Sequence, residues 1–459
     1  MAVLTTIFVV ECADHIASLN TRRQGSDKQI EELMLITKSP APDVPAVARR
    51  LRRDGHHRDG VAPGEEASAQ DADRDAVPPC SLNVTIYGPT TYPNGFSALA
   101  SGWNDLLARS RYDTFFLTHE WQSVWWQQLG AGDLWILAFY RGESEDPADL
   151  SHSTHDSSGL VGIAPFYLSE HKEGEWAGKR SLKLVGCVEV SDFLDIIIAA
   201  GWEKEVYYCL LDWLQSEEAP AWDYLDLCNL PEDSLSYNAL PSIFRNAGLR
   251  VEVDQEDVAP HVHLPARYES YLMQIDKKQR HEIRRKQRRV ERELDVGFSL
   301  IQSMDELQGA MDEFLRLQRM SRPDKESFMT PHMERFFRVM AGRMLETGHL
   351  HLSFLSLNGE NAAALLAFEY KKELLLYNSG YDTEKWAGYS PGWVLLGYVI
   401  QHAIARGIEV FDFLQGDEEY KYRFGGHDYR VMRTLIMNEP VEGAERAPAG
   451  GKIGTAAPA

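Results

Sequence analysis

The sequence contains no long hydrophobic run and few cysteines. None of its apolar stretches approaches the ~20 consecutive residues that span a bilayer, so we expect no membrane span. The first residues, MAVLTTIFVVEC, lack the basic region and the small-residue cleavage site of a secretory signal. The five cysteines are odd in number and form no C-x-x-C pair: Cys12, Cys80, Cys187, Cys209 and Cys228. We therefore predict a cytoplasmic protein without a disulfide framework or a zinc site.

Positive charge is also scarce. The chain has 47 lysines and arginines against 69 aspartates and glutamates, which gives a formal net charge of −22. A polyanion of this kind does not bind DNA or an anionic lipid surface non-specifically. Any anionic ligand must be held by a local cluster of cations, so each such cluster is informative.

Several catalytic motifs are missing. The sequence has no P-loop, no G-x-S-x-G, no H-E-x-x-H and no convincing Ser-His-Asp order. Two histidine pairs, His261 with His263 and His349 with His351, have the spacing of one strand face, which can suit a metal ion. Neither pair has an evident third ligand, so we expect no metal.

The chain consists of an ordered part between two tails. Residues 1–81 and 438–459 are rich in small and charged residues, and we expect them to be disordered. The ordered part mixes β-rich runs with amphipathic helical stretches, which predicts an α/β fold with mixed sheets. Its halves, 82–264 and 265–437, have a similar order of elements. We interpret them as two tandem domains, the second closed by the run YRVMRTLIM.

The stretch YNSGYDTEKWAGYSPGWVLLGYVIQHAIARG carries the first candidate site. Ser390 is expected to cap a helix that Pro391 begins and Gly407 ends. Free N–H groups at a helix start beside small residues can hold a pyrophosphate. Gly388, Ser390 and Gly392 are therefore candidate cofactor-binding residues. An ordinary, well-capped connection between a strand and a helix would explain the same residues.

The second candidate site lies in FDFLQGDEEYKYRFGG. A carboxylate near the carboxyl end of the expected strand 408–413 is where an open α/β sheet places its chemistry. Asp412 can accept a proton or orient an amine, and Lys421 and Arg423 can hold an anionic substrate. The alternative is that Asp412 caps a turn and that the two cations pair with the acidic residues 417–419.

A basic segment forms the third candidate. Lys277–Glu293 holds nine lysines and arginines against three glutamates, with a thin apolar stripe. Arg284, Arg285 and Arg288 are expected to bind an anionic substrate. A solvated helix with charge pairs four residues apart is an equally good interpretation.

A smaller candidate is Asp192, in the run VSDFLDIIIA of the first half. It can face a cleft as a substrate-binding residue, or it can cap a turn. The aromatic run FLTHEWQSVWW is expected to be core.

Together these segments resemble the GNAT-like acyltransferases of the CelD type, the cellulose-biosynthesis acetyltransferases, which are related to the Fem-type peptidoglycan aminoacyltransferases. The resemblance covers roughly residues 84–437. It is carried by FLTHEWQSVWW, VSDFLDI and RRKQRRVERE, and above all by Tyr377, Ser390-Pro391-Gly392, Asp412, Gly416 and Tyr420-Lys421. The usual GNAT phosphate loop, Q/R-x-x-G-x-G/A, is absent, since EKWAGYSPG holds only Gly388 and Gly392.

The resemblance implies tandem GNAT-like domains and transfer of an acetyl or other acyl group from acyl-CoA to an amine or hydroxyl. The acceptor would be a small molecule or glycan precursor with anionic groups, used in polysaccharide or cell-envelope biosynthesis. Fem-type relatives use aminoacyl-tRNA, so a tRNA-dependent transferase acting on a peptidoglycan-like precursor is the alternative. A non-catalytic binding protein is the third.

The expected mechanism is direct attack of the acceptor on the donor's carbonyl carbon. Backbone N–H groups of the strand 374–377 would polarise the carbonyl. Asp412 would act as the base or orient the amine, and Tyr377 or Tyr420 would protonate the leaving thiolate. Lys421 and the basic segment would hold the acceptor.

Overall fold

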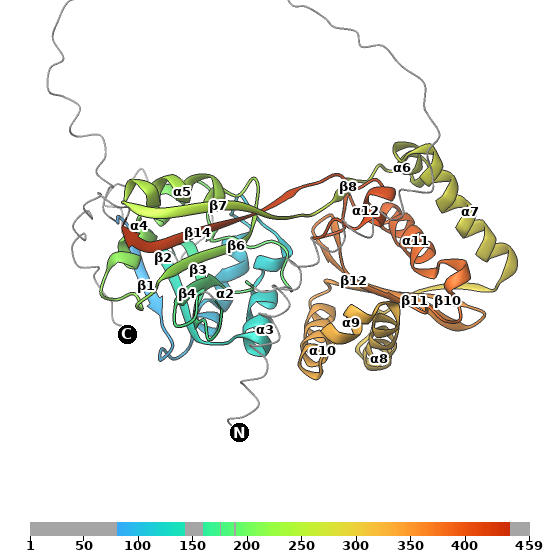
Figure 1. The fold of residues 1–459 in the computed structure, drawn as a ribbon, viewed down its shortest axis with the longest axis horizontal. Helices are drawn as coiled ribbons and strands as arrows, with labels where there is room; N and C mark the ends of the chain where they lie inside the picture. Colours follow the sequence, from blue (N-terminus) through green and yellow to red (C-terminus); the bar gives the residue numbers. More distant parts are fainter. Residues whose placement is uncertain (1–79, 143–158, 175, 188–189, 441–459) are drawn as a thin grey trace, which may run out of the picture. The chain divides into compact units, whose positions relative to one another are not determined.

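The computed structural model describes residues 80–142, 159–174, 176–187 and 190–440 (Figure 1). Apart from residues 80–81 and 438–440, the two tails that the sequence predicts as disordered lie outside the described residues, and so does Cys12. Among the described residues, those of the segment His171–Gly178 belong to one compact unit and the others to a second unit, which contains both β-sheets.

The first sheet is mixed and has eight strands. Their order is β1-β2-β3-β4-β6-β14-β7, with β5 paired to β3. Neighbours are antiparallel except β4 and β6, which are parallel. The strands are β1 Asn83–Tyr87, β2 Asp133–Tyr140, β3 Leu160–Glu170, β4 Arg180–Leu184, β5 Ile197–Ile198, β6 Tyr224–Pro231, β7 Leu249–Val258 and β14 Arg430–Pro440.

Helices cover both faces of this sheet. They are α2 Gly95–Leu107, α3 His119–Leu129, α4 Glu203–Gln215 and α5 Leu235–Asn246, with a 3₁₀ turn at Phe115–Leu117. The alternation of β2 explains the arrangement, since successive side chains of a strand point to opposite faces. Ile136 lies against α2, where a Cβ on Gly95 would come within 2.7 Å of it. Its neighbour Trp135 contacts Trp213 of α4 instead, with ring centroids 6.1 Å apart.

The second sheet is also mixed and has six strands. Their order is β8-β13-β12-β11-β10-β9, and β12 and β13 form its parallel pair. The strands are β8 His261–His263, β9 Val296–Leu300, β10 Leu350–Leu357, β11 Glu360–Tyr370, β12 Glu373–Tyr381 and β13 Val410–Asp412. The helices are α6 Tyr268–Gln274, α7 Lys277–Glu293, α8 Met304–Ser321, α9 Pro323–Phe328, α10 Pro331–Glu346, α11 Pro391–Ala405 and α12 Glu419–Arg423, with a 3₁₀ turn at Ala387–Tyr389.

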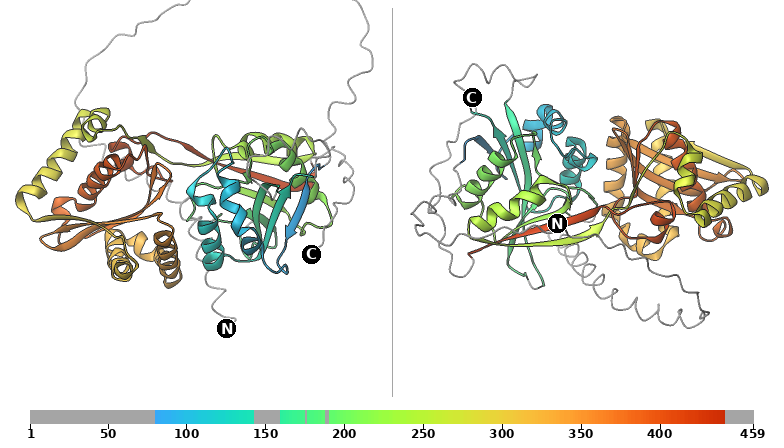
Figure 2. Two further views of the ribbon diagram at one scale, coloured as in Figure 1. Left: turned by 180° about the vertical axis from the view of Figure 1, so that it is seen from behind. Right: turned by 90° about the horizontal axis from the view of Figure 1, so that it is seen from above.

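Two cores lie on opposite faces of the second sheet. Leu374 and Leu376 of β12 belong to a core with α6, α7 and α11, while Leu375 belongs to a core that includes α8 and α10. Figure 2 shows these two sets of helices on either side of the sheet. The core of Leu375 continues into the first half, where Phe115 stacks on Phe368 with centroids 4.2 Å apart. The predicted mixed α/β fold is thereby confirmed.

The last described strand, β14, does not close the second half as the sequence suggests. It lies between β6 and β7 in the first sheet (Figure 1). The strand β8 crosses in the other direction, since it follows β7 in the chain but pairs with β13. The boundary between residues 264 and 265 remains a prediction, and these two pairings cross it.

Short elements such as β9 and α12 were not expected from the sequence. The strand β9 carries a glycine and partly exposed side chains, so it lacks the alternation that marks a strand. The helix α12 has five residues, too few to show a helical period. No helix in the described ranges is both long and apolar enough to cross a membrane.

The position of β14 makes one ion pair important for stability. Arg433 donates from Nε and Nη2 to the two carboxylate oxygens of Asp226 on β6, at 2.7 and 2.8 Å. The carboxylate is buried, with 4% of its side chain exposed. Arg433→Ala would leave that charge without its bidentate partner, so we expect a loss of roughly 3 kcal/mol in the free energy of unfolding, measured in urea.

Arg430→Ala is the matched control, because Arg430 on the same strand pairs with Glu232 at an exposed position. We expect no measurable change for this variant. Equal effects of both substitutions would contradict the importance of the buried pair.

Candidate active site

The strands β12 and β13 pair over a short length and then diverge. Their register runs from Glu373–Val410 to Leu375–Asp412, whereas β12 continues to Tyr381. On its other side, β12 has a bulge, since Leu366 lies opposite Asn378 and Ala367 opposite Leu376. Tyr377 therefore has no direct partner on β11. This part of β12 offers backbone groups to a ligand beside a strand edge that β13 does not cover.

Tyr377 is packed against aromatic side chains from both halves. Its ring contacts Phe368 and Trp121, with centroids 4.9 and 5.6 Å away. Its hydroxyl donates to the carbonyl oxygen of Val190 at 3.0 Å. Burial, and then the charge of Asp192, raise the pKa of Tyr377 well above its usual value. The side chain of Tyr377 is thus packed and hydrogen-bonded in place, and its hydroxyl is a weak acid.

Asp412, the predicted base, is the last residue of β13 and is buried. The backbone N–H of Leu414 donates to its Oδ1 at 2.7 Å, as in the predicted turn cap. Burial, with the charges of Glu373 and Asp192, raises the pKa of Asp412 to about 8, against the opposing effects of the Leu414 N–H and Lys421. The carboxyl group is therefore mostly protonated at neutral pH.

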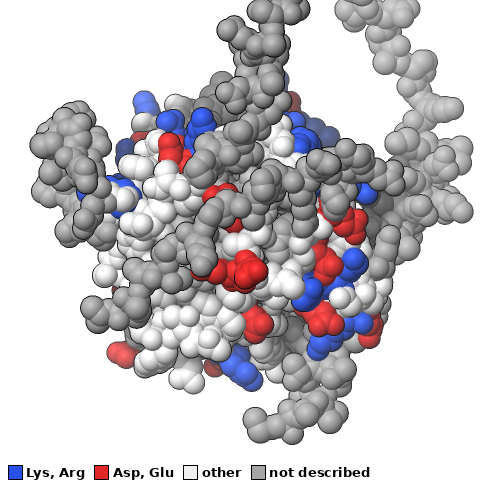
Figure 3. Space-filling view, turned by 90° about the vertical axis from the view of Figure 1, so that its left-hand side faces the viewer, with Lys and Arg blue, Asp and Glu red and all other residues white. Residues whose placement is uncertain are grey.

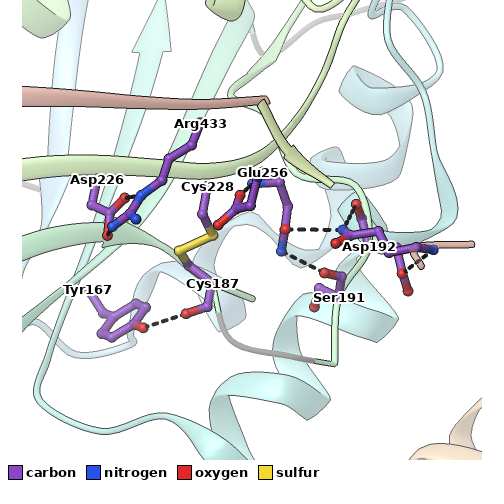
Figure 4. The surroundings of a disulfide bond; sticks show 10 residues. Tyr167, Cys187, Ser191, Asp192, Asp226, Cys228, Glu256 and Arg433 are labelled. Atoms are coloured by element: carbon purple, nitrogen blue, oxygen red, sulfur yellow. Dashed lines mark hydrogen bonds and ion pairs between the residues drawn. A yellow bond between two sulfur atoms is a disulfide. The ribbon is translucent and has the colours of Figure 1, made fainter. Parts of the chain in front are cut away.

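Asp192 meets the loop after β13. The N–H of Gln415 donates to Oδ1 of Asp192 at 2.9 Å, and the Gln415 amide donates to the Asp192 carbonyl at 2.6 Å. The same amide reaches Oδ1 of Asn229 at 3.1 Å, and Asn229 donates to the carbonyl of Ser191 at 2.7 Å (Figure 4). Burial raises the pKa of Asp192 to about 6. Asp192 and Asp412, predicted from separate halves, thus lie at one site.

Lys421 is buried, with 2% of its surface exposed. Its ammonium donates to the carbonyl oxygens of Leu414, Gln415 and Gly416 at 2.8, 2.6 and 3.0 Å, and it pairs with Glu418 at 2.9 Å. Two of these residues have positive φ, Leu414 at 57° and Gly416 at 109°. Lys421 therefore stabilises the conformation of the loop 414–416. The predicted contact with an anionic acceptor remains untested, but all three donors are already engaged.

Tyr420 and Arg423, the other two candidate residues of this segment, have different surroundings. Tyr420 is partly buried and its ring meets Phe413 edge-on, with centroids 6.3 Å apart. Burial and the charge of Glu418 raise the pKa of Tyr420. Arg423 forms an ion pair with Glu419 four residues earlier, as in the alternative that the sequence allows.

The helix start at Pro391 has the predicted proline but not the predicted cap. Ser390 occupies the N-cap position with φ 52° and ψ 57°, and its side chain makes no capping hydrogen bond. Gly388 has open space around it, since a Cβ there would meet no heavy atom within 4 Å. At Gly392 a Cβ would lie 3.1 Å from the ring of Tyr381. The first N–H groups of α11 are thus beside small, partly exposed residues.

The basic helix α7 packs against this helix start. A Cβ on Gly397 of α11 would lie 2.8 Å from the amide of Gln287, which shows how closely the two helices approach. Arg289 donates to the carbonyl of Gly388 at 3.0 Å, and its guanidinium lies 4.7 Å from the ring of Tyr389. Lys286 lies 4.3 Å from the ring of Trp393. The first and third predicted sites are therefore neighbours.

The outer side of α7 forms a basic hollow of about 490 Å³, lined by His281, Arg284, Arg285, Arg288, Arg289 and Arg292. Arg284 pairs with Glu269 and Arg285 with Glu282. Arg288 has no ion-pair partner among the residues that the structure describes. The face shown in Figure 3 differs, because basic and acidic side chains lie side by side there, most densely at its right-hand edge.

The histidines of the two pairs contact other side chains. Burial lowers the pKa of His351 to about 3, and its ring lies 5.9 Å from that of His402. The rings of His261 and His263 contact each other at 5.5 Å. Within the described ranges, no group of three or more His, Cys, Asp or Glu side chains is arranged to hold a metal.

The cysteine prediction is wrong. Cys80 is bonded to Cys209, and Cys187 to Cys228. The pairs could not be recognised from an odd number of cysteines without close spacing. The partners are 129 and 41 residues apart and meet only in the fold. The second disulfide lies next to the site, since Cys228 directly precedes Asn229 (Figure 4). The carbonyl of Cys187 accepts a hydrogen bond from the hydroxyl of Tyr167 at 3.2 Å.

Three polar residues of the site were not found from the sequence as site residues: Asn229, Gln415 and Lys325. Lys325 on α9 donates to the carbonyl of Ser379 on β12 at 2.5 Å. Gln415 precedes Gly416, which the resemblance includes, and this was the one available signal. Asn229 and Lys325 have ordinary sequence surroundings.

The raised pKa of Asp412 predicts a pH-dependent stability. The folded protein binds this proton more tightly than the unfolded chain, so the stability falls as pH rises from the ordinary aspartate pKa toward about 8. Asp412→Asn is neutral throughout. We expect its Tm to match the wild type near pH 4 and to exceed it increasingly up to pH 8, as measured by differential scanning calorimetry.

Asp417→Asn provides the control in the same loop, at an exposed position. Its Tm difference from the wild type should not vary in this way with pH. An Asp412→Asn difference that stays constant between pH 4 and 8 would refute the buried, protonated carboxyl group.

The disulfide beside the site predicts a second effect. Replacing Cys187 and Cys228 by serine opens a loop of 41 residues, so we expect a loss of about 4 kcal/mol in the free energy of unfolding on the chain-entropy model. Urea denaturation measures it. The pair Cys80–Cys209 is the control, because its removal should affect stability while leaving the Asp192–Gln415 contacts in place. Thiol counting that finds all four cysteines reduced in the native protein would contradict both bonds.

Comparison with known proteins gives a partial match. A family model described as an acetyltransferase (GNAT) domain matches residues 277–422. No curated protein sequence matches the chain.

Among solved structures, the chain is similar to the crystal structure of FemX, with 8% identity, a TM-score of 0.51 and coverage of 73% of this chain and 95% of FemX. A conserved protein of unknown function from Bacteroides thetaiotaomicron has 10% identity and a TM-score of 0.46, over 74% of this chain and 97% of its own. A tandem GNAT protein from the clavulanic acid biosynthesis pathway has 12% identity and a TM-score of 0.39, over 77% and 98%. The chain thus carries a GNAT acetyltransferase match in its second half and shares the fold of FemX.

Proposed function

We propose that the protein transfers an acetyl or other acyl group from acyl-CoA to an amine. The observation that carries the proposal is the divergence of β12 and β13 after Leu375, beside the bulge at Tyr377 and the start of α11. This arrangement puts an uncovered strand edge and a helix N-terminus next to each other. The GNAT match to residues 277–422 covers all of these elements.

The donor's phosphates would lie at the start of α11. Backbone N–H groups near Ser390 and Gly392 can donate to a pyrophosphate, and the helix dipole favours negative charge there. Arg289 brings positive charge to the same place through its bond to Gly388. Arg284, Arg285 and Arg288 extend this basic surface along α7 and would hold the donor's remaining phosphate rather than the acceptor.

The acceptor would approach from the side of Asp412 and Asp192. Two carboxyl groups with raised pKa values suit an amine, which can give its proton to the ionised form of either. Backbone N–H groups around Tyr377 would polarise the donor's carbonyl. Lys421 acts indirectly, because it fixes the loop that carries Gln415 and thereby the position of Asp192.

The finer assignment is a CelD-type enzyme acting on a polysaccharide or cell-envelope precursor with anionic groups. It is supported by the sequence resemblance. The two disulfides remove the argument for a cytoplasmic location that was based on cysteine content. The remaining argument for this location is that the proposed donor, acyl-CoA, is supplied in the cytoplasm.

A Fem-type transferase that uses aminoacyl-tRNA is the second candidate. The FemX-like fold and the missing GNAT phosphate loop favour it. Its activity would be lost on treatment with ribonuclease, whereas transfer from acyl-CoA would not. A non-catalytic binding protein would show neither activity.

Gly388 allows a sharp test of donor binding. Its surroundings are open, so a side chain can be added without steric conflict. Gly388→Asp would place a negative charge where the phosphates are expected. We predict that acetyl-CoA raises the Tm of the wild type by several degrees and that the aspartate variant loses this shift, with at least tenfold weaker binding in calorimetry.

Gly388→Asn is the control, because it has nearly the same shape without the charge. It should keep most of the shift. An unchanged shift in Gly388→Asp would place the phosphates elsewhere, and no shift with acetyl-CoA or longer acyl-CoA in any variant would refute acyl-CoA as donor.

A further inference from the structure

The ammonium of Lys325 lies at the strand edge that the proposed donor would occupy. It donates to the carbonyl of Ser379 at 2.5 Å and approaches Oδ1 of Asn378 at 3.4 Å. Both residues belong to the part of β12 beyond its last pairing with β13. Two of the three N–H groups of Lys325 thus have acceptors among the described residues, which leaves one to face a ligand.

Close packing places Lys325 there. A Cβ on Gly380 would overlap the backbone of Gln318, so α8 lies directly on β12. The side chain of Gln318 in turn donates to the carbonyl of Lys325 at 3.3 Å, at the start of α9. The short helix α9 is therefore held against the strand edge, and the position of the ammonium follows from the packing of three elements.

The surroundings of Lys325 make it a competent acid. Burial lowers the pKa of Lys325 to about 8, and the charge of Arg322 lowers it too. Glu418, from the loop before α12, and Asp324 act in the opposite direction. This value is close to that of a thiol, about 8.5, so a proton can pass between the two groups with little change in free energy.

We propose that Lys325 is the catalytic acid that protonates the sulfur leaving the acyl donor, an inference that rests on the acyl transfer proposed above. The nitrogen of the acceptor forms a bond to the carbonyl carbon, and the carbon–sulfur bond breaks with its electron pair moving to sulfur. The ammonium of Lys325 gives a proton to this sulfur and becomes a neutral amine. The extra proton on the acceptor nitrogen passes to the ionised form of Asp412 or Asp192, and exchange with water restores each group.

The two tyrosines that the sequence offers for this role are less suited to it. Tyr377 already donates its hydroxyl proton to Val190. Its pKa and that of Tyr420 are raised above the ordinary value by burial, which makes both phenols weaker acids. Lys325 differs, because its environment favours loss of the proton.

The test compares Lys325→Ala with Lys325→Arg by the release of free thiol from acetyl-CoA, with a panel of primary amines and amino sugars as acceptors. We expect kcat of the alanine variant to fall by roughly 100-fold, a typical effect of removing a general acid. Binding of acetyl-CoA should change by less than about threefold, since the phosphate contacts remain. Added propylammonium should restore part of the rate.

Lys325→Arg distinguishes proton transfer from charge. A guanidinium keeps its proton, so this variant should be as slow as the alanine variant. We expect wild-type kcat to decrease as the pH rises through about 8, because Lys325 then loses its proton. This decrease should be absent from Lys325→Ala. Lys372→Ala is the control at the opposite end of β12, where the exposed lysine pairs with Glu409, and it should keep the full rate.

The outcomes separate the two proposals. Full activity in Lys325→Ala, or restored activity in Lys325→Arg, would overturn the role of Lys325 while leaving the acyltransferase intact. A wild type that neither binds acetyl-CoA nor releases thiol would overturn the function and the role of Lys325 together. If Lys325→Ala fails to fold, Lys325→Met retains the aliphatic stem and takes its place in the same assays.

Discussion

The pairing of β14 with β6 and β7 is the constraint on which the rest of the structure depends. The chain leaves the second sheet at Asp412 and must reach the first sheet at Arg430, so the segment between them is held at both ends. That segment contains the loop 414–416 and the helix α12. The tether explains why Gln415 can meet Asp192 and Asn229, which come from the first half. The site is therefore a product of strand exchange between the sheets.

The electrostatics of the site follow from burial more than from ion pairing. Burial raises the pKa of both Asp192 and Asp412, and the charge of Asp192 raises that of Asp412 too, while Lys421 is shared among three carbonyls and Glu418. Positive charge that can reach a ligand lies instead on α7 and at Lys325. The molecule thus separates a carboxyl-rich side from a cationic side along one strand, β12. Under the proposed function, such a division suits the movement of a proton from the nucleophile to the leaving group.

Local patterns in the sequence predicted much of this arrangement. The mixed α/β fold, the helix beginning at Pro391, the buried run around Trp121 and the buried stripe of α7 all appear in the structure. Their signals are periodicity and capping, which act over a few residues. The position of β14 and the two disulfides could not be predicted, because each depends on which distant segments meet. Lys325 was missed for the same reason, since only packing through Gly380 brings it to β12. The carbonyls that bind Lys421 are only five to seven residues earlier, but they converge through a loop with positive φ at Leu414 and Gly416, which no local pattern indicates.

The late position of β14 in the chain has a consequence for synthesis on the ribosome. The strands β6 and β7 are made about 180 residues before the strand that lies between them, and at 5–20 residues per second the gap lasts roughly 10–40 s. During this interval each of the two strands has an uncovered edge, which can pair wrongly with another chain. The first half can complete its sheet only when residue 440 has left the exit tunnel. The edges of β6 and β7 thus stay open to wrong pairing for as long as β14 is missing.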